Sequence, residues 1–184
     1  MRRMLVSIIA AAVGIGLWAT PASAGTGSIT YRNDRDDTAN VLDIRYVGTD
    51  QIRSGGRFVY LEVGTWDPFQ EGDLNVQNDN YFVYLFDTQR RARFDFLVFL
   101  YYWPADGKFY CDAYTRNGTQ IGTRDAFLTG PDGARGVVAE GIYCIFPRAW
   151  LEIQKPPRFA VESWYSNVFR DRAPDPGQGK FQGL

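Results

Sequence analysis

The chain has 184 residues, of which 45% are hydrophobic and 16% aromatic, and its formal net charge at pH 7 is −1. Basic residues are scattered along it, which argues against nucleic acid or anionic lipid as a partner, because both require a concentrated positive surface. The chain contains no histidine. This excludes Ser-His-Asp and Cys-His catalysis as normally built, together with histidine-ligated metal sites.

Residues 1–24 have the three parts of an export signal. Arg2 and Arg3 form a positive start, an uncharged and mostly apolar run follows, and residues 21–24 end in small side chains before Gly25. At about 17 residues the apolar run is at the short end for a membrane-spanning helix, so cleavage is favoured over an anchor. We therefore expect a secreted mature protein that begins near Gly25 and has no membrane span.

Carboxylate side chains gather where the predicted domain begins. Calcium takes six or more oxygen ligands, and closely spaced carboxylates on a loop can supply several of them. The alternative, which the sequence favours, is a solvated acidic turn that caps strand ends. The candidate calcium ligands are Asp34, Asp36, Asp37 and Asp43.

Short apolar stretches separated by turn residues fill the middle of the chain. Residues 42–46 and 58–63 alternate with a period of two, as half-buried strands do. Residues 81–86 are apolar on both faces, which is typical of a strand covered on both sides. Further strands are expected over residues 94–103, 108–115, 141–146 and 158–164.

Aromatic and β-branched residues dominate these stretches, and no segment of the mature chain has a convincing helical period. The pattern predicts an all-β protein with a single antiparallel β-sandwich, jelly-roll-like, of about eight or nine strands. This domain is expected over residues 25–166. Residues 167–184 are polar and contain proline and glycine, so a flexible polar tail is predicted there.

Cys111 and Cys144 are the two cysteines, and both lie in apolar, strand-like stretches. An even count in an exported chain favours a disulfide over two buried free thiols. Closing a loop of this size stabilises a fold by about 3–4 kcal/mol on the chain-entropy model.

Three landmarks resemble a known group of proteins. An acidic pair at residues 36–37 precedes Leu-Asp-Ile at 42–44, residues 84–87 read Tyr-Leu-Phe-Asp, and residues 147–151 read Pro-Arg-Ala-Trp-Leu. This order is similar to that of secreted, mostly uncharacterised actinobacterial β-sandwich proteins, and faintly to family-9-like (DOMON-like) carbohydrate-binding sandwiches. Trp150 stands where that group often has a cysteine, so a disulfide through that position is absent here. The resemblance implies the fold more than an activity.

Tryptophan and tyrosine side chains exceed what a small core must hold. Sugar rings stack their C–H faces on aromatic planes, while nearby polar groups bind their hydroxyls. The alternative is ordinary packing, because strands favour aromatic residues. The candidate ligand-binding residues are Trp66, Trp103, Tyr101 and Trp164.

The sequence thus predicts a secreted, non-enzymatic binding or cell-surface module, with carbohydrate or another cell-envelope ligand as its partner. One alternative is a small carbohydrate-active enzyme that uses two carboxylates roughly 5–10 Å apart, drawn from Glu62, Glu140, Glu152 and Glu162. The other is a structural or protein-interaction domain. An exposed row of two or three aromatic side chains would favour binding, and two close carboxylates in a cleft would favour an enzyme.

Overall fold

The computed structural model describes residues 29–33, 41–50, 57–89, 93–130, 139–152, 158–173 and 182–183. The predicted signal peptide, residues 1–24, lies outside the described residues. Within the described ranges, no helix combines the length and the apolar character needed to cross a lipid bilayer.

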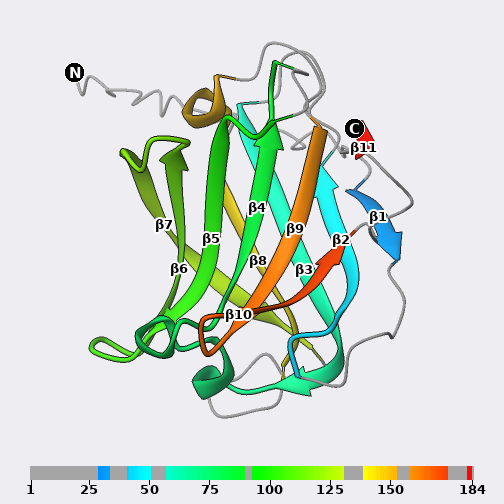
Figure 1. Cartoon of the computed structure of the whole chain (residues 1–184), viewed down its shortest axis with the longest axis vertical. Helices are drawn as coiled ribbons and strands as arrows, with labels where there is room; N and C mark the ends of the chain where they lie inside the picture. Colours follow the sequence, from blue (N-terminus) through cyan, green and yellow to red (C-terminus); the bar gives the residue numbers. More distant parts are fainter. Residues whose placement is uncertain are drawn as a thin grey trace, which may run out of the picture.

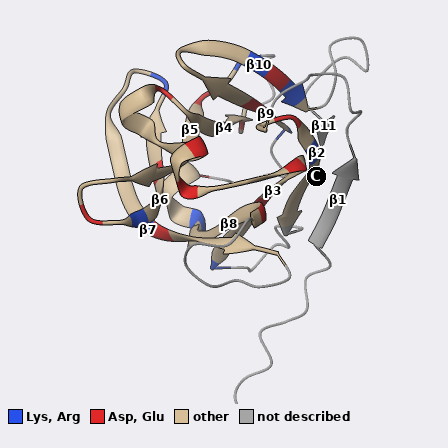
Figure 2. Ribbon diagram, turned by 90° about the horizontal axis from the view of Figure 1, so that it is seen from below, with Lys and Arg blue, Asp and Glu red and all other residues tan. Residues whose placement is uncertain are grey.

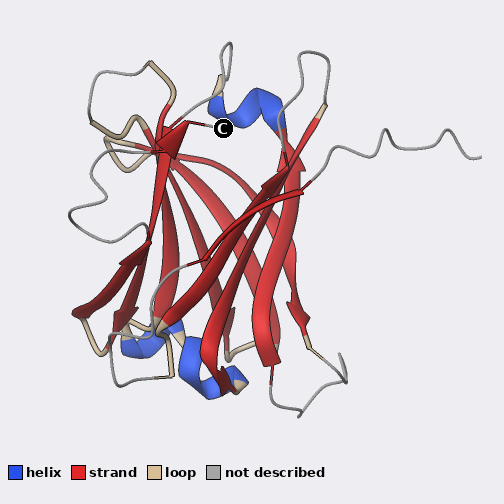
Figure 3. Cartoon of the chain, turned by 90° about the vertical axis from the view of Figure 1, so that its right-hand side faces the viewer, coloured by secondary structure: helices blue, strands red, loops and turns tan. Residues whose placement is uncertain are grey.

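The protein is all-β, as the sequence predicts, with short 3-10 helices at the two ends of the sheet (Figure 3). The strands are β1 (Ile29–Asn33), β2 (Ile44–Asp50), β3 (Phe58–Phe69), β4 (Tyr81–Asp87), β5 (Phe96–Trp103), β6 (Lys108–Thr115), β7 (Gln120–Thr129), β8 (Ala139–Pro147), β9 (Arg158–Tyr165), β10 (Val168–Ala173) and β11 (Gln182–Gly183). The 3-10 helices are η1 (Glu71–Leu74), η2 (Val76–Asn78) and η3 (Arg148–Leu151).

The named strands pair antiparallel along one continuous path, in the order β1-β2-β3-β8-β7-β6-β5-β4-β9-β10, and β11 pairs with β9 (Figure 1). Seen along its long axis, the sheet curls into a ring that brings β10 back toward β2 (Figure 2). The backbone N–H of Ile44 in β2 donates a hydrogen bond to Asp171 Oδ2 in β10 at 2.7 Å. One core therefore fills the inside of the curled sheet.

Alternation along the strands explains how the core is filled. In β5, Phe96, Val98 and Leu100 are buried inside the sheet, while the residues between them face outward. β4 is buried on both of its faces, as predicted for residues 81–86. Tyr84 is fully buried, and its hydroxyl donates to the backbone oxygen of Glu62 at 2.6 Å. A buried hydroxyl needs such a partner to offset its desolvation.

Cys111 in β6 and Cys144 in β8 form a disulfide, which confirms the prediction. Both residues are fully buried in the core. Strand β7 lies between β6 and β8, where Cys111 is registered with Arg124 and Cys144 with Ala126. The bond therefore joins two strands that are not direct neighbours and ties them across the inner side of the third.

The sheet extends beyond the predicted domain boundary at residue 166. Residues 168–173, expected in a flexible tail, form β10 and pair with β9. The turn before β10 consists of Ser166 and Asn167, both with positive φ, as in the two-residue turns that join twisted hairpins. The Ser166 N–H donates to Asn80 Oδ1 at 2.7 Å. Hydrogen bonds hold this polar segment in place, and polarity alone did not reveal them.

Candidate functional site

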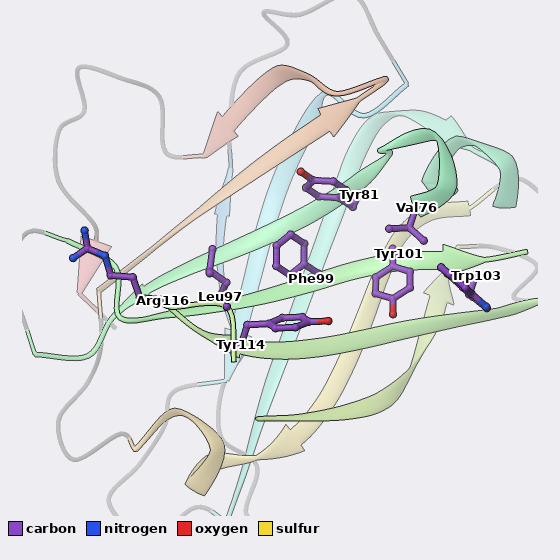
Figure 4. A pocket seen from close by; sticks show the side chains of 9 residues that line it. Val76, Tyr81, Leu97, Phe99, Tyr101, Trp103, Tyr114 and Arg116 are labelled. Atoms are coloured by element: carbon purple, nitrogen blue, oxygen red, sulfur yellow. The ribbon is translucent and has the colours of Figure 1, made fainter. Parts of the chain in front are cut away.

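A groove with a volume of about 470 Å³ opens on the outer face of β4, β5 and β6 (Figure 4). Strand β5 forms its floor, because the residues of β5 that point away from the core, at every second position, all point into it. Arg116 lies at one end, near Leu97, and Trp103 lies at the other. The groove is lined by Val76, Tyr81, Leu97, Phe99, Tyr101, Trp103, Tyr114, Arg116 and Gly118.

A row of aromatic rings crosses this outer face from β10 to β6. Neighbouring ring centroids are 5.9 Å apart for Phe169 and Trp164, 6.2 Å for Trp164 and Tyr81, 5.2 Å for Tyr81 and Phe99, and 5.6 Å for Phe99 and Tyr114. Each ring stands on a different strand, and paired strands are close enough for their side chains to touch. The row therefore forms one apolar surface that continues into the groove.

The structure brings some of the predicted ligand-binding residues together and separates one. Tyr101 and Trp103 line the groove, and Trp164 is stacked on Tyr81 next to it. Trp66 is in β3, outside the groove, with the Arg45 guanidinium 5.3 Å from its ring centroid. Trp66 and Trp103 look alike in the sequence because a proline follows each of them within two residues, and only the strand order separates them.

Three aromatic residues of the groove were not among the predicted ligand-binding residues: Tyr81, Phe99 and Tyr114. For Phe99 a signal existed, because it shares the outward period of Tyr101 and Trp103 in the same strand. Tyr81 and Tyr114 join the groove through the pairing of β4 and β6 with β5. The turn at residues 104–107 indicates the pairing of β6 with β5, and a pattern for single strands does not show which side chains of the two strands then meet.

Asp112 of β6 is hydrogen-bonded to two tyrosines that line the groove. Its side chain is buried, with the residue only 5% exposed. Its Oδ2 accepts hydrogen bonds from the Tyr101 hydroxyl at 2.8 Å, the Tyr114 hydroxyl at 3.3 Å and Gln120 Nε2 at 3.3 Å. Among the described residues, Asp112 Oδ1 has no hydrogen-bond partner.

The tyrosine hydroxyls of this face are held in their protonated form. Burial, with the hydrogen bond to Asp112, raises the pKa of Tyr101 well above its ordinary value. Burial and the charge of Asp112 also raise the pKa of Tyr114. Beside the groove, the hydrogen bond from the Tyr110 hydroxyl to Asp106 raises the pKa of Tyr110 to about 12. At neutral pH each hydroxyl therefore keeps its proton and donates a hydrogen bond to a carboxylate.

Of the four candidate calcium ligands, Asp34, Asp36 and Asp37 lie outside the described residues. Asp43 directly precedes β2 and is buried, and its backbone oxygen accepts from the Trp66 N–H at 3.0 Å. Within the part of the chain that is described, no three or more acidic or cysteine side chains gather as a metal site. Calcium binding stays a prediction.

The glutamates considered for a carboxylate pair lie on four different elements. Glu62 of β3 is buried and accepts from the hydroxyls of Tyr46 and Tyr60 at 3.1 and 2.8 Å. Glu162 of β9 pairs with Arg172 at 3.5 Å. Two further glutamates are exposed, one in β8 and one at the end of η3: Glu140 and Glu152.

A second group of apolar side chains lies on the outer face of β3, β7 and β8. Phe58, Phe127 and Ile145 are exposed there. The Phe127 ring lies 5.4 Å from that of Tyr143, which in turn stacks on Tyr60 at 5.5 Å. This patch is separate from the groove, because none of its residues is among those that line the groove.

Comparison of the chain with protein-family models, curated proteins and solved structures finds no match. The resemblance to secreted β-sandwich proteins therefore stays a prediction, and a function has to be argued from the geometry of the groove.

Proposed function

We propose that this chain is a secreted, non-enzymatic binding module whose groove and aromatic row bind carbohydrate. The observation that carries the proposal is the row of five rings in contact across β10, β9, β4, β5 and β6. A sugar ring presents a flat C–H face that matches an aromatic plane, and an extended oligosaccharide presents several such faces in succession. The four outward residues of β5 span about 20 Å at roughly 3.3 Å per residue, which suits a chain ligand.

The polar groups of the groove support the same ligand class. The phenol oxygens of Tyr101 and Tyr114 lie beside the ring of Phe99, so a bound sugar meets apolar surface and hydrogen-bonding oxygens together. Binding sites for small polar molecules combine a mostly apolar wall with a few placed polar groups. None of the four candidate glutamates is among the lining residues of the groove, which supports binding there over hydrolysis by a pair of them.

Export of the protein from the cytoplasm is part of the proposal. A disulfide persists in oxidising compartments, so the Cys111–Cys144 bond supports export. The signal-like sequence at residues 1–24 supports it as well.

The test is a titration of the mature protein with neutral polysaccharides of glucose, xylose, mannose and N-acetylglucosamine, followed by tryptophan fluorescence. The groove contains Trp103, and Trp164 lies next to it, so a ligand stacked on this face changes the emission. A saturable change with at least one glycan is expected. A flat response to every glycan would overturn the proposal.

A second candidate function is self-association through the other apolar patch, favoured by the exposure of Phe58, Phe127 and Ile145 on one face. Large exposed apolar patches mark interaction sites. Sedimentation velocity over a concentration series tests it: a dimer that Phe127→Glu dissociates is expected, and a monomer at all concentrations would refute it.

A further inference from the structure

The hydrogen bonds around Asp112 decide whether the middle of the groove offers hydrogen-bond donors or acceptors to a ligand. A phenol has one proton to donate and two lone pairs to accept with, and an ionised carboxylate only accepts. Tyr101 and Tyr114 both direct their single proton to Asp112 Oδ2. Each phenol oxygen is therefore left with lone pairs alone for a ligand in the groove.

Gln120 extends this arrangement. Its Nε2 group has two protons, and it donates to Asp112 Oδ2 at 3.3 Å and to Thr123 Oγ1 at 2.9 Å. Both protons are used, so the amide of Gln120 offers its oxygen. Gln120 thus adds a third donor to the carboxylate that holds the two groove tyrosines.

Because Asp112 is buried, the tyrosine hydroxyls cannot easily turn away from it to donate to a ligand instead. If either tyrosine hydroxyl turned toward a ligand, the buried carboxylate would lose a donor, and a buried charge without donors is strongly destabilising. Asp112 already has one oxygen, Oδ1, with no partner in the described part of the chain. The raised pKa values of Tyr101 and Tyr114 agree with hydroxyls that keep their proton on this hydrogen bond.

We propose that the middle of the groove selects ligand groups that donate hydrogen bonds, and that Asp112 is the positioning residue that sets this preference. The ligand class is a neutral glycan with free hydroxyl groups, rather than one whose hydroxyls are etherified or acylated. Donors of the protein stand at the two ends of the groove instead, at the Trp103 indole and the Arg116 guanidinium. This inference rests on the proposed function, because it takes the groove as the glycan site.

The first test compares neutral hexasaccharides with their per-O-methylated forms, because a methyl ether keeps the acceptor oxygen and loses the donated proton. Methylation is expected to weaken binding to the native protein at least tenfold. The double variant Tyr101→Phe/Tyr114→Phe keeps both rings. In it, the ratio of the dissociation constants of the methylated and unmethylated hexasaccharides is expected to fall toward one. Equal binding of both ligands to the native protein, or an unchanged ratio in the double variant, would overturn the ligand preference.

The second test needs no ligand. Tyrosine ionisation is followed by absorbance at 295 nm in the native protein and in Asp112→Asn, with Tyr110→Phe as the control for the separate bond to Asp106. The carboxylate's removal is expected to lower the pKa of Tyr101 and Tyr114, and an unchanged titration would overturn the role of Asp112. If Asp112→Asn does not fold, Tyr101→Phe and Tyr114→Phe replace it, and each should remove one late-ionising tyrosine.

The two tests separate the two ideas. If none of the native glycans binds, the proposed function fails and the ligand preference fails with it. If a glycan binds but methylation has no effect, the proposed function stands and only the inference fails. The titration decides in either case whether Asp112 orients the two hydroxyls.

Discussion

The backbone N–H of Ile44 donates to the carboxylate of Asp171 across 2.7 Å, although 127 residues separate the two. Ile44 begins β2, near one end of the strand order, and Asp171 is in β10 at the other. Strands β2 and β10 are not paired through their backbones in the described sheet, so a side chain takes the place of a backbone carbonyl. This contact holds the curled sheet together where its two ends meet.

Replacing Asp171 tests that closure. Asp171→Ala is expected to lower the free energy of unfolding by about 1–3 kcal/mol, because the buried N–H of Ile44 loses its acceptor. Asp171→Asn keeps an acceptor oxygen and should lose less. Urea denaturation measures both, and equal losses in the two variants would contradict the assigned role of the hydrogen bond.

Two tryptophans provide a matched test of the groove. Trp103 lines the groove and is 39% exposed, whereas Trp66 lies outside it and is 40% exposed. Trp103→Ala is expected to weaken glycan binding about tenfold, since losing a buried aromatic contact costs about 1–2 kcal/mol and 1.4 kcal/mol is one decade. Trp66→Ala should leave the dissociation constant unchanged. Isothermal titration calorimetry distinguishes them, and equal effects would place the ligand elsewhere.

Phe99 joins the Tyr114 end of the aromatic row to the other rings, because its ring contacts both Tyr81 and Tyr114. Phe99→Ala is expected to divide the row and to reduce glycan affinity by about 1–2 kcal/mol. The control is Phe127→Ala, which removes an exposed ring of β7 that contacts Tyr143. Circular dichroism checks that both variants are folded. If Phe127→Ala weakens binding as much as Phe99→Ala, the glycan does not lie along the row.

Removing the disulfide is expected to affect stability and leave the groove in place. Cys111→Ala/Cys144→Ala should lower the free energy of unfolding by about 3–4 kcal/mol on the chain-entropy model. Both sulfurs are in the core and neither lines the groove, so glycan affinity should persist at a temperature where the variant is folded. The bond itself is checked by mass spectrometry of the native protein, alkylated without reductant. Two modified thiols would refute the disulfide.

Stability should fall on the alkaline side of pH 10. The pKa values of Tyr101, Tyr114 and Tyr84 are raised from the ordinary value of 10.0, mainly by burial. Below pH 10 these tyrosines are protonated in both the folded and the unfolded chain, so their full contribution to the free energy of unfolding is present. Above pH 10 the unfolded chain releases the protons first, and the free energy of unfolding falls as pH rises toward the folded-state pKa values.

Urea denaturation between pH 9 and 12 measures this slope. Tyr101→Phe removes one of the shifted groups and is expected to make the decline shallower. A native protein whose stability is constant across that range would contradict the raised pKa values.

The sequence by itself determined the local structure. The period of two in residues 58–63 and the aromatic run that ends at Trp103 predicted strands, and the structure contains β3 and β5 there. The two cysteines in apolar stretches predicted the disulfide that joins β6 to β8. Alternation of this kind depends on neighbours in the chain, and it is the same for every all-β architecture.

Tertiary structure decided which residues share a face. Trp66 and Trp103 follow the same local pattern, yet the strand order puts only Trp103 in the groove. Asp112 looks like an ordinary strand carboxylate until the pairing of β5 with β6 brings Tyr101 to it. The same holds for Asp171, whose partner in β2 is 127 residues away. The separation of the two tryptophans and the Ile44–Asp171 contact depend on which strands, distant in sequence, become neighbours, and that is decided only when the whole sheet curls around one core.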